Sequence, residues 1–150
     1  MDKPSVRFQR ANFVVRNLER ALEFYVGVLG FSLDFVKNSD AASYSYTVFA
    51  IPAEAKIRFA VLSAPGQPRV LALTEICDIS LEPIAPPRRA AIVLETPDVN
   101  GVVARAERAG FTVRPEGELL TFDGRYGREV GLMDADDNLT VIYCLPDQAD

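Results

Sequence analysis

The sequence predicts an α+β protein of two tandem βαβββ modules, whose curved mixed sheets form a cleft with the helices on the outer side. The main observation is a repeated pattern. Residues 14–33 and residues 93–113 each read as a strand, a capped amphipathic helix, a glycine and a new strand. Gly30 matches Gly110, 80 residues later. A pattern that recurs after about half the chain is typical of a duplicated unit.

The opening of the first unit shows both periodicities. In a strand over Phe8–Arg16, period two places Ala11, Phe13 and Val15 on one face, which we expect to face the following helix. Asn17 is a favourable N-cap and Gly30 a favourable left-handed stop. The apolar stripe expected between them consists of Leu18, Ala21, Leu22, Tyr25 and Leu29.

Further strand signals complete the first unit. Alternating or continuous apolar runs predict strands over Phe31–Val36, Tyr44–Ile51, Ile57–Leu62 and Val70–Ile76. Residues 63–68 have the composition of a hairpin turn between the last two. Residues 82–87 contain three prolines and are the best candidate for a linker.

The second unit repeats this order. A strand over Arg89–Glu95 leads to an N-cap at Asp98, and Gly110 ends the helix. The expected buried stripe of that helix is Val99, Val102, Val103, Ala106 and Ala109. Strands are predicted near Phe111–Arg114, Glu118–Phe122, Glu129–Met133 and Leu139–Cys144, with residues 134–138 as a polar turn. Residues 126–129 are expected to approach the third of these strands as a plain loop or as a lip over the cleft. We therefore expect one domain over residues 1–150, with module one at about 6–80 and module two at about 88–145.

Composition restricts the class of protein. Hydrophobic residues make up 49% and charged residues 25%, values typical of globular proteins. No apolar run approaches the roughly 18 residues of a membrane helix, and no apolar signal core follows the first residues. We expect a cytoplasmic protein without a membrane partner. Cys77 and Cys144 lack metal-site spacing and are expected to be free thiols.

Charge is unevenly distributed between the halves. The net charge of −5 divides into +2 for residues 1–75, from 9 basic and 7 acidic side chains, and −7 for residues 76–150, from 7 and 14. An acidic chain without basic clusters is a poor nucleic-acid binder but attracts cations. With no histidine, neither thiol has an imidazole base, and no glycine-rich phosphate loop occurs.

The same segments resemble the vicinal oxygen chelate superfamily, which includes glyoxalase I, the bleomycin-resistance proteins and the extradiol dioxygenases. Residues 15–25, closing in 28–31, are similar to the opening of that family, residues 97–111 to its mid-chain element, and residues 134–139 to its closing turn. The resemblance covers almost the whole chain. It implies paired βαβββ modules around a cleft, commonly in a dimer.

The resemblance also implies where metal-dependent members hold a divalent ion. Three of the family's metal-ligand positions fall at Arg10, at Ala90 or Ala91, and at Val141. The fourth falls in the strand Val70–Ile76, at Ala72, with Glu75 close by. Metal ligands are neutral imidazoles, carboxylates or thiolates, and a guanidinium cannot ligate. We therefore expect neither a metal nor a cofactor.

Other polar groups are then expected to determine the chemistry of the cleft. Arg10 and Asn12 share the strand face opposite the helix, and Tyr143 shares a face with Val141. Arg10 either binds an anionic group of a ligand or forms an internal ion pair with Glu75, Glu95 or Glu129. No catalytic residue is assigned. The candidate ligand-binding residues are Arg10, Asn12, Tyr46, Arg58, Thr74 and Tyr143.

Three functions remain open on these grounds. The first is a protein that binds a small aromatic or cationic molecule in the cleft. The second is a metal-independent lyase, isomerase or cyclase acting on a small oxygenated substrate, with a Glu or Tyr as acid or base. The third is a noncatalytic dimeric module. A homodimer is expected in each case, because C2 pairing is the commonest oligomeric state.

Overall fold

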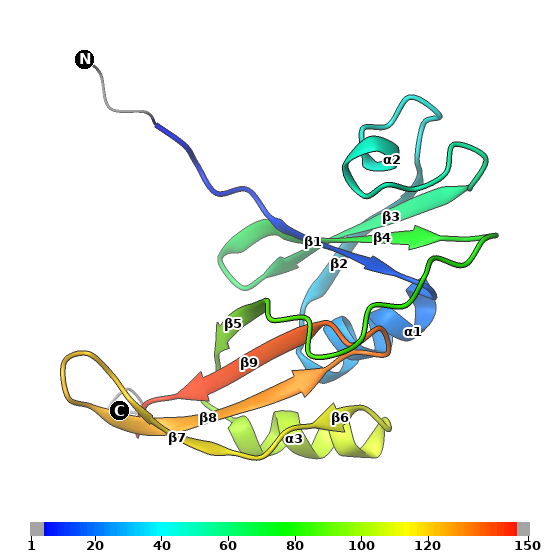
Figure 1. The fold of residues 1–150 in the computed structure, drawn as a ribbon. Helices are drawn as coiled ribbons and strands as arrows, with labels where there is room; N and C mark the ends of the chain where they lie inside the picture. The colour runs from blue at the N-terminus through cyan, green and yellow to red at the C-terminus, as the bar shows by residue number, and fades with distance from the viewer. Residues whose placement is uncertain (1–4, 147–150) are drawn as a thin grey trace.

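The computed structural model of the protein describes residues 5–146 (Figure 1). Module one contains β1 (Ala11–Val15), α1 (Leu18–Leu22), the π-helix η1 (Glu23–Val28), β2 (Ser32–Asn38), α2 (Ser45–Val48), β3 (Ile57–Ala64) and β4 (Gln67–Ile76). Module two contains β5 (Ala91–Glu95), α3 (Val99–Arg108), β6 (Thr112–Val113), β7 (Gly117–Leu120), β8 (Tyr126–Met133) and β9 (Leu139–Cys144). None of the helices in this part of the chain is long and apolar enough to cross a membrane.

The strands form one mixed sheet per module. Sheet one has the order β1-β4-β3-β2, and sheet two has the order β5-β9-β8-β6, with β7 also paired to β8. In each sheet the first strand of the module runs parallel to the last one, β1 beside β4 and β5 beside β9, and the other pairs are antiparallel. The repeated topology confirms the predicted α+β class and its two βαβββ units.

Each sheet has a face that packs against helices and an opposite face, which we call the helix-side face and the open face. In β1, Ala11, Phe13 and Val15 belong to the main core, as predicted, so Asn12 and Val14 lie on the open face. In β5, Ile92 and Leu94 belong to the same core, which leaves Ala91, Val93 and Glu95 on the open face. This alternation decides which side chains can line a cleft.

The first helix begins as predicted and then changes its period. Asn17 Oδ1 accepts a hydrogen bond from Arg20 N at 2.9 Å, which is the expected N-cap. From Glu23 the turn widens to π-helix, seen where Leu29 N donates to Phe24 O, five residues back. The wider turn changes the buried stripe. Its members are Leu18, Ala21, Phe24, Tyr25 and Val28, so the predicted burial of Leu22 and Leu29 is only partial.

The predicted strand over Tyr44–Ile51 is wrong. Residues Ser45–Val48 form the short helix α2, and Ile51 N donates to Tyr46 O at 2.9 Å to close the following turn. Burial explains the difference, because this segment covers one end of sheet one with a second apolar cluster instead of adding a strand. That cluster is built on Ile51, Ala55, Ile57 and Ile76, with Val14, Tyr46, Phe49 and Ile79 packed against it.

Module two follows the prediction closely except before β8. Asp98 Oδ1 caps α3 by accepting from Gly101 N, and both Gly30 and Gly110 adopt positive φ angles of 86° and 80°. Residues 126–128, predicted as a loop, belong to β8, because β7 pairs along them from Leu120↔Tyr126 to Gly117↔Glu129. The hairpin of β7 and β8 therefore extends sheet two further than the sequence suggested.

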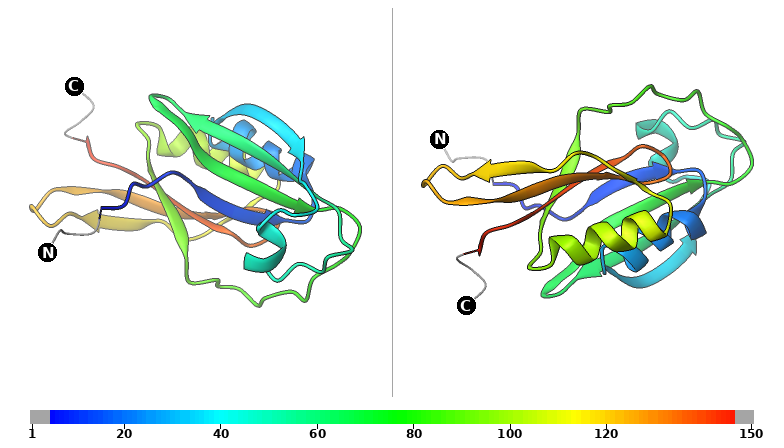
Figure 2. Two further views of the ribbon diagram at one scale, coloured as in Figure 1. Left: turned by 90° about the horizontal axis from the view of Figure 1, so that it is seen from above. Right: turned by 90° about the horizontal axis from the view of Figure 1, so that it is seen from below.

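The two modules pack together through their helices. Phe24 and Phe111 meet edge to face at 5.0 Å between ring centroids, and Arg105 Nε donates to Val28 O at 3.1 Å. Figure 2 shows α3 beside the first helix in the view from below. One core therefore includes residues of both modules, and residues 77–90, which contain neither helix nor strand, connect them along the surface.

Candidate functional site

The faces of β1 and β5 establish which residues of the two modules correspond. The N-caps Asn17 and Asp98 lie 81 residues apart, one more than the two glycines, because the first helix, with its π-helical turn, has one more residue between N-cap and glycine than α3 has. With this offset, Asn12 corresponds to Val93, and both lie on open faces. Arg10 therefore corresponds to Ala91 and not to Ala90, which settles the choice that the sequence left open.

The strand registers place the other two family positions. Asn12 lies beside Ala72 of β4, and Val93 lies beside Val141 of β9, so Ala72 and Val141 occupy equivalent open-face sites. The four positions are Arg10, Ala72, Ala91 and Val141, which carry a guanidinium, two methyl groups and an isopropyl group. No such group donates to a divalent cation, so these residues do not fit a metal. Within residues 5–146 there is also no other cluster of three or more His, Cys, Asp or Glu side chains suited to one.

Three of the predicted ligand-binding residues lie on or beside the open face of sheet one. Thr74, only 2% exposed, donates its hydroxyl to Asn12 Oδ1 at 3.1 Å across β4 and β1. Arg10 lies just before β1, is exposed, and its Nε donates to Arg69 O at 3.4 Å. Asn12 is exposed and Thr74 is buried, so Asn12 and Arg10 are the groups of this set that a ligand can reach.

Arg58 lies on the opposite face of sheet one. Its Nε donates to Glu75 Oε1 at 2.6 Å and its Nη2 donates to Glu19 Oε1 at 2.6 Å. Glu75 Oε2 in turn accepts from Leu18 N at 2.5 Å, at the start of α1. These bonds, to Glu75 first and Glu19 second, raise the pKa of Arg58 above its ordinary value. The cluster ties the helix to the sheet, and Glu75 is not available to pair with Arg10.

Tyr46 lies away from the other predicted residues. Its hydroxyl donates to Ala55 O at 2.7 Å, and its ring packs in the second apolar cluster. Tyr44, with 73% of its surface exposed, does not share that environment. The hydroxyl of Tyr46 is thus used to hold the segment that covers the end of sheet one.

The open face of sheet two presents a row of three polar side chains. Glu95 of β5 is the register partner of Tyr143 in β9, and Glu129 of β8 is the partner of Tyr143 on its other side. The Tyr143 hydroxyl donates to Glu95 Oε2 at 3.1 Å. Desolvation first, and this hydrogen bond second, raise the pKa of Tyr143, so the phenol stays protonated at neutral pH. We call Glu95, Tyr143 and Glu129 the carboxylate–tyrosine row.

Two cavities adjoin this row. One of about 630 Å³ lies where β5 meets the hairpin and helix end of module one, and Glu95, Thr96 and Tyr143 contribute to its wall. The other, of about 360 Å³, lies over β8 and β9, with Glu129 and Arg125 among its lining residues. Val93 and Tyr143 line both cavities, so the row lies at their junction. Cavities of this size accommodate small organic molecules.

Two arginines border the row. Arg125 lines the smaller cavity and pairs with Asp123 at 3.1 Å. The side chain of Arg114 lies over Gly131, where a Cβ atom would come within 3.3 Å of Arg114 Cγ. Gly131 is the register partner of Val141, so Arg114 lies next to the second family position in module two.

The sequence predicts Tyr143, but not its two neighbours, as a ligand-binding residue. It offers Glu95 and Glu129 only as partners of Arg10 or as acids and bases. Part of the row can be predicted from the sequence. Glu95 lies two residues after Val93 in the first strand of module two, so both side chains lie on the same face of that strand. The register that brings Glu129 beside Tyr143 depends on the β8–β9 hairpin, and its alignment becomes visible only in the structure.

Comparisons with known proteins identify the class. The family model of the Glyoxalase/Bleomycin resistance protein/Dioxygenase superfamily matches residues 7–142, and the chain belongs to this superfamily. None of the curated proteins matches the sequence. The family match and the two βαβββ sheets together define a protein of the glyoxalase fold.

Solved structures agree with this fold. A glyoxalase family protein from Bacillus cereus has 17% identity, covers 97% of this chain and 98% of its own, and gives a TM-score of 0.73. An antibiotic binding protein from Streptomyces sp. CB03234 has 21% identity, coverage of 96% and 99%, and a TM-score of 0.59. A fosfomycin resistance protein from Mesorhizobium loti has 18% identity, coverage of 95% and 92%, and a TM-score of 0.56. At these identities the likeness establishes the fold alone.

Proposed function

We propose that the protein binds a small organic ligand, with an aromatic or cationic group, in a cleft over the open face of sheet two, without a metal ion. The observation that carries this proposal is the carboxylate–tyrosine row at the junction of the two cavities. The names of two similar structures, an antibiotic binding protein and a fosfomycin resistance protein, are consistent with small-molecule binding on this fold.

Metal independence follows from the four family positions. A divalent ion needs three or four convergent donors, and Ala72, Ala91 and Val141 offer only hydrocarbon. Arg10 adds a positive charge that repels a cation. Binding must therefore rely on hydrogen bonds, charge and apolar contact.

The chemistry of the row favours a ligand that carries a positive charge on or near a flat ring. Glu95 offers a carboxylate, and Tyr143 offers both a ring face and a hydroxyl, so an ammonium or guanidinium group gains charge–charge and cation–π contacts. Val93 supplies apolar wall beside them, with 62% of its surface exposed in the single chain. The net charge of −7 in residues 76–150 attracts cations to this half of the molecule.

Ligand screening by thermal shift tests this function, because a ligand that binds the folded state raises Tm by mass action. The panel contains aromatic ammonium and guanidinium compounds, glycopeptide antibiotics, aromatic acids and divalent metals. Cationic aromatic compounds should raise Tm, and titration calorimetry should then show weaker binding to Glu95→Gln and Tyr143→Phe but unchanged binding to Glu107→Gln on the exposed side of α3. A response to aromatic acids or metals alone would contradict the proposal. No response at all would favour a noncatalytic module.

A second candidate function rests on the Tyr143–Glu95 hydrogen bond. A phenol held 3.1 Å from a carboxylate is an acid–base pair that can deliver a proton to a substrate oxygen and return it. A metal-independent lyase, isomerase or cyclase can use such a pair on a small oxygenated substrate. Tyr143→Phe separates the two functions, since it abolishes proton transfer but retains the ring that contacts a ligand.

The proposal includes a homodimer and a cytoplasmic location. Dimer formation is supported by exposed apolar side chains of module two, which include Val93 on β5 and Phe122 in the turn between β7 and β8. Light scattering at micromolar concentration tests it, and a mass near the 16.5 kDa of one chain would contradict it. Fractionation of the native cells tests the location.

A further inference from the structure

The outer edge of β5 carries backbone groups that sheet two does not use. Among the described strands, β5 is an edge strand and pairs only with β9, in parallel. Thr96 N donates to Tyr143 O at 2.9 Å, so Thr96 and Leu94, two residues before it, direct their backbone groups toward β9. Because this direction alternates along a strand, Val93 and Glu95 direct their N–H and C=O groups away from β9.

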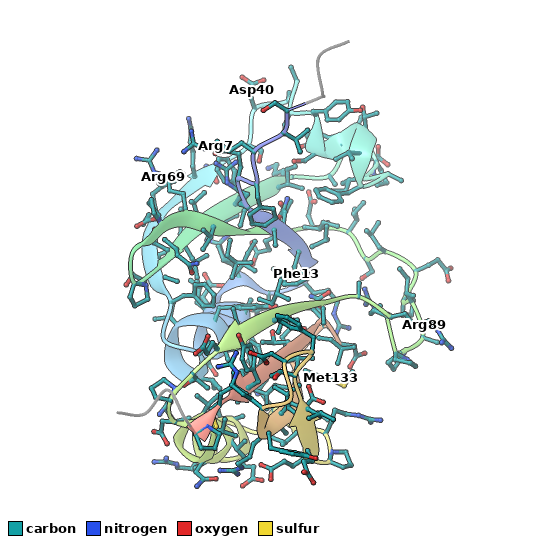
Figure 3. The ribbon with its side chains drawn as sticks, turned by 90° about the vertical axis from the view of Figure 1, so that its left-hand side faces the viewer. Arg7, Phe13, Asp40, Arg69, Arg89 and Met133 are labelled. Atoms are coloured by element: carbon teal, nitrogen blue, oxygen red, sulfur yellow. The ribbon has the colours of Figure 1, made fainter. Side chains whose placement is uncertain are left out.

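These outward groups border the larger cavity. Val93 and Glu95 both belong to its wall, and the β3–β4 hairpin contributes Gln67 to the same cavity of about 630 Å³. In Figure 3, β5 (light green) crosses the front of the molecule between Arg69 of sheet one and Met133 of sheet two. None of the backbone hydrogen bonds that turns and loops form within residues 5–146 reaches the outward groups. The edge therefore has room for one short extended segment.

The two faces beside this edge differ in chemistry. On the open face, Glu95 and Tyr143 belong to the carboxylate–tyrosine row. On the helix-side face, Leu94, Val102 and Ile142 line the same cavity with hydrocarbon. Side chains of an extended segment alternate between the two faces of a sheet. A segment along β5 would thus meet a carboxylate with one residue and an apolar wall with the next.

We propose that the cationic ligand of this protein is a short peptide, which binds in extended conformation along the outer edge of β5, between that strand and the β3–β4 hairpin. Its backbone forms hydrogen bonds with Val93 and Glu95. Its basic side chains lie on the open face, where one of them reaches Glu95 and Tyr143. This inference rests on the proposed function and specifies the class of its ligand.

A peptide suits this site better than a simple amine. An aromatic ammonium compound contacts Glu95 and Tyr143 but leaves the edge of β5 without partners. A peptide supplies the row with a charge and also presents N–H and C=O groups at the spacing of a neighbouring strand. The net charge of −7 in residues 76–150 favours a basic peptide over an acidic one.

The register determines the order of side chains in the peptide. Residues opposite each other on neighbouring strands lie on the same face of a sheet, whichever direction the added strand takes. The peptide residue beside Leu94 therefore faces the apolar wall, and the residues beside Val93 and Glu95 face the open side. A basic–apolar–basic tripeptide fits this edge. A tripeptide of the same composition in the order basic–basic–apolar must either place a cation against hydrocarbon or leave one residue beyond the edge.

Titration calorimetry with blocked tripeptides tests this register. Acetyl-Lys-Leu-Lys-amide should bind about tenfold more tightly than acetyl-Lys-Lys-Leu-amide, which has the same charge and composition, because one charge-assisted contact is lost in the second peptide. Acetyl-Glu-Leu-Glu-amide should show no binding. Equal affinities of the two lysine peptides would overturn the register, and the absence of binding by all three would overturn the inference.

Methylation of the peptide backbone separates strand pairing from charge attraction. A form of acetyl-Lys-Leu-Lys-amide that is methylated at the nitrogen of each residue retains both charges and all side chains but loses its N–H donors. Its affinity should fall by about tenfold or more, since the acceptors on β5 are left without partners. An unchanged affinity of the methylated peptide would overturn the pairing with β5.

The same donor–acceptor pairing can be tested on the protein. Val93→Pro removes one outward N–H, at a position where an edge strand tolerates proline. Val93→Ala is its matched control, because it also removes the side chain but retains the N–H. Circular dichroism first establishes that both variants are folded. Val93→Pro should bind acetyl-Lys-Leu-Lys-amide about three- to tenfold more weakly than Val93→Ala. Equal affinities of two folded variants would contradict the pairing, and if Val93→Pro does not fold, the methylated peptide decides.

Hydrogen exchange followed by NMR locates the bound peptide. The amide protons of Val93 and Glu95 should exchange about tenfold or more slowly when acetyl-Lys-Leu-Lys-amide is bound, because the peptide covers them. Benzylammonium, which has no peptide backbone, should not protect them. The amide of Leu94, which lies on the β9 side of the strand, is the internal control. Binding without protection of Val93 and Glu95 would overturn the inference.

The outcomes for the two proposals are distinguishable. Cationic aromatic compounds that bind through Glu95 and Tyr143, while no tripeptide binds, refute the peptide and leave the proposed function standing. A tripeptide that protects the edge of β5 but binds Glu95→Gln and Tyr143→Phe as tightly as wild type refutes the proposed function, and with it the place given to the basic side chain. The strand pairing would then stand alone.

Discussion

The hydroxyl of Tyr25 donates a hydrogen bond of 2.8 Å to Asp134 Oδ2, joining the first helix of module one to the last turn of module two. Both side chains are buried, at 0% and 4% exposure. The same carboxylate accepts from Asp136 N, Asn138 N and Asn138 Nδ2 at 2.8–2.9 Å. Burial, and then the nearby carboxylate, raise the pKa of Tyr25, so it remains a donor.

Tyr25→Phe should lower the free energy of unfolding by about 1–3 kcal/mol, because it leaves a buried carboxylate oxygen short of one donor. Urea denaturation followed by circular dichroism measures the change. Tyr126→Phe is the matched control, since Tyr126 is 59% exposed. If both variants have the same stability as the wild type, the bond contributes nothing to holding the modules together.

Glu75 should make stability depend on pH in the acid range. Its burial favours a higher pKa, but hydrogen bonds from Arg58, from Leu18 N and from Cys77 outweigh that effect and lower the pKa of Glu75 below its ordinary 4.5. A carboxyl with a lowered folded-state pKa contributes stability above the unfolded value and loses it as pH falls through the folded value. The free energy of unfolding should therefore decrease below about pH 4.5.

The variant Glu75→Gln should flatten this decrease, although it is less stable at neutral pH. Chemical denaturation at several pH values between neutrality and the acid range measures the slope, with Glu107→Gln as the exposed control. An equally steep decrease in Glu75→Gln would show that other carboxyl groups cause it.

Gly127→Ala should destabilise the sheet of module two. A Cβ atom at this position would come within 2.2 Å of Cys144 O and 2.8 Å of Leu145 Cδ2, so β8 and β9 must move apart. We expect a loss of about 1–3 kcal/mol, the usual effect of overpacking. Gly27→Ala is the control, because nothing lies within 4 Å of its Cβ, and in a helix it should gain about 0.5–1 kcal/mol. Thermal melting compares the two variants, and equal Tm values would contradict the expectation.

Protein reconstituted with zinc, nickel, iron or manganese should retain well under one equivalent of metal at the family site by elemental analysis. The combined variant Arg10→His, Ala72→Glu, Ala91→His and Val141→Glu supplies imidazole and carboxylate donors at those four positions, and it should retain metal. A stoichiometric ion in the wild-type protein would show that the correspondence between the modules is wrong.

Arg10→Met should leave the stability of the monomeric fold within about 0.5 kcal/mol, as for other surface substitutions. The reason is that Arg10 is exposed and makes one long hydrogen bond, to Arg69 O. If Arg10 also contacts an anionic group of a ligand, affinity should fall by about 1.5–3 kcal/mol. Urea denaturation at low protein concentration and titration calorimetry separate the two effects. A loss of about 3–5 kcal/mol in stability would instead indicate a buried ion pair.

Local signals were sufficient for most of the fold. The helix starts and ends could be predicted directly, because each depends on one residue and its near neighbours. Asn17 and Asp98 cap the helix starts, and the two glycines end the helices. The helix around Tyr46 could not be predicted in this way, because an alternation of tyrosine and small polar residues also fits a strand. Burial against the end of sheet one decided for a helix there.

The site was harder to predict than the fold. Arg58 and Thr74 both lie on predicted strands, but their side chains lie on opposite faces of sheet one. Arg58 lies on the helix-side face and pairs with Glu75, whereas Thr74 lies on the open face and contacts Asn12. Tyr143 could be placed beside Val141 from one strand alone. Its neighbours Glu95 and Glu129 come from two other strands, and only the sheet registers bring them to it.

Because the core is shared between the modules, the duplicated unit is not the cooperative unit. Phe24 of the first helix packs on Phe111, which follows α3. Removing either module therefore exposes the apolar surface of the other. The chain should unfold in a single transition, and separately expressed halves should fold only after they associate. By the same argument, a protein that consisted of one module alone would fold only as a pair of identical chains.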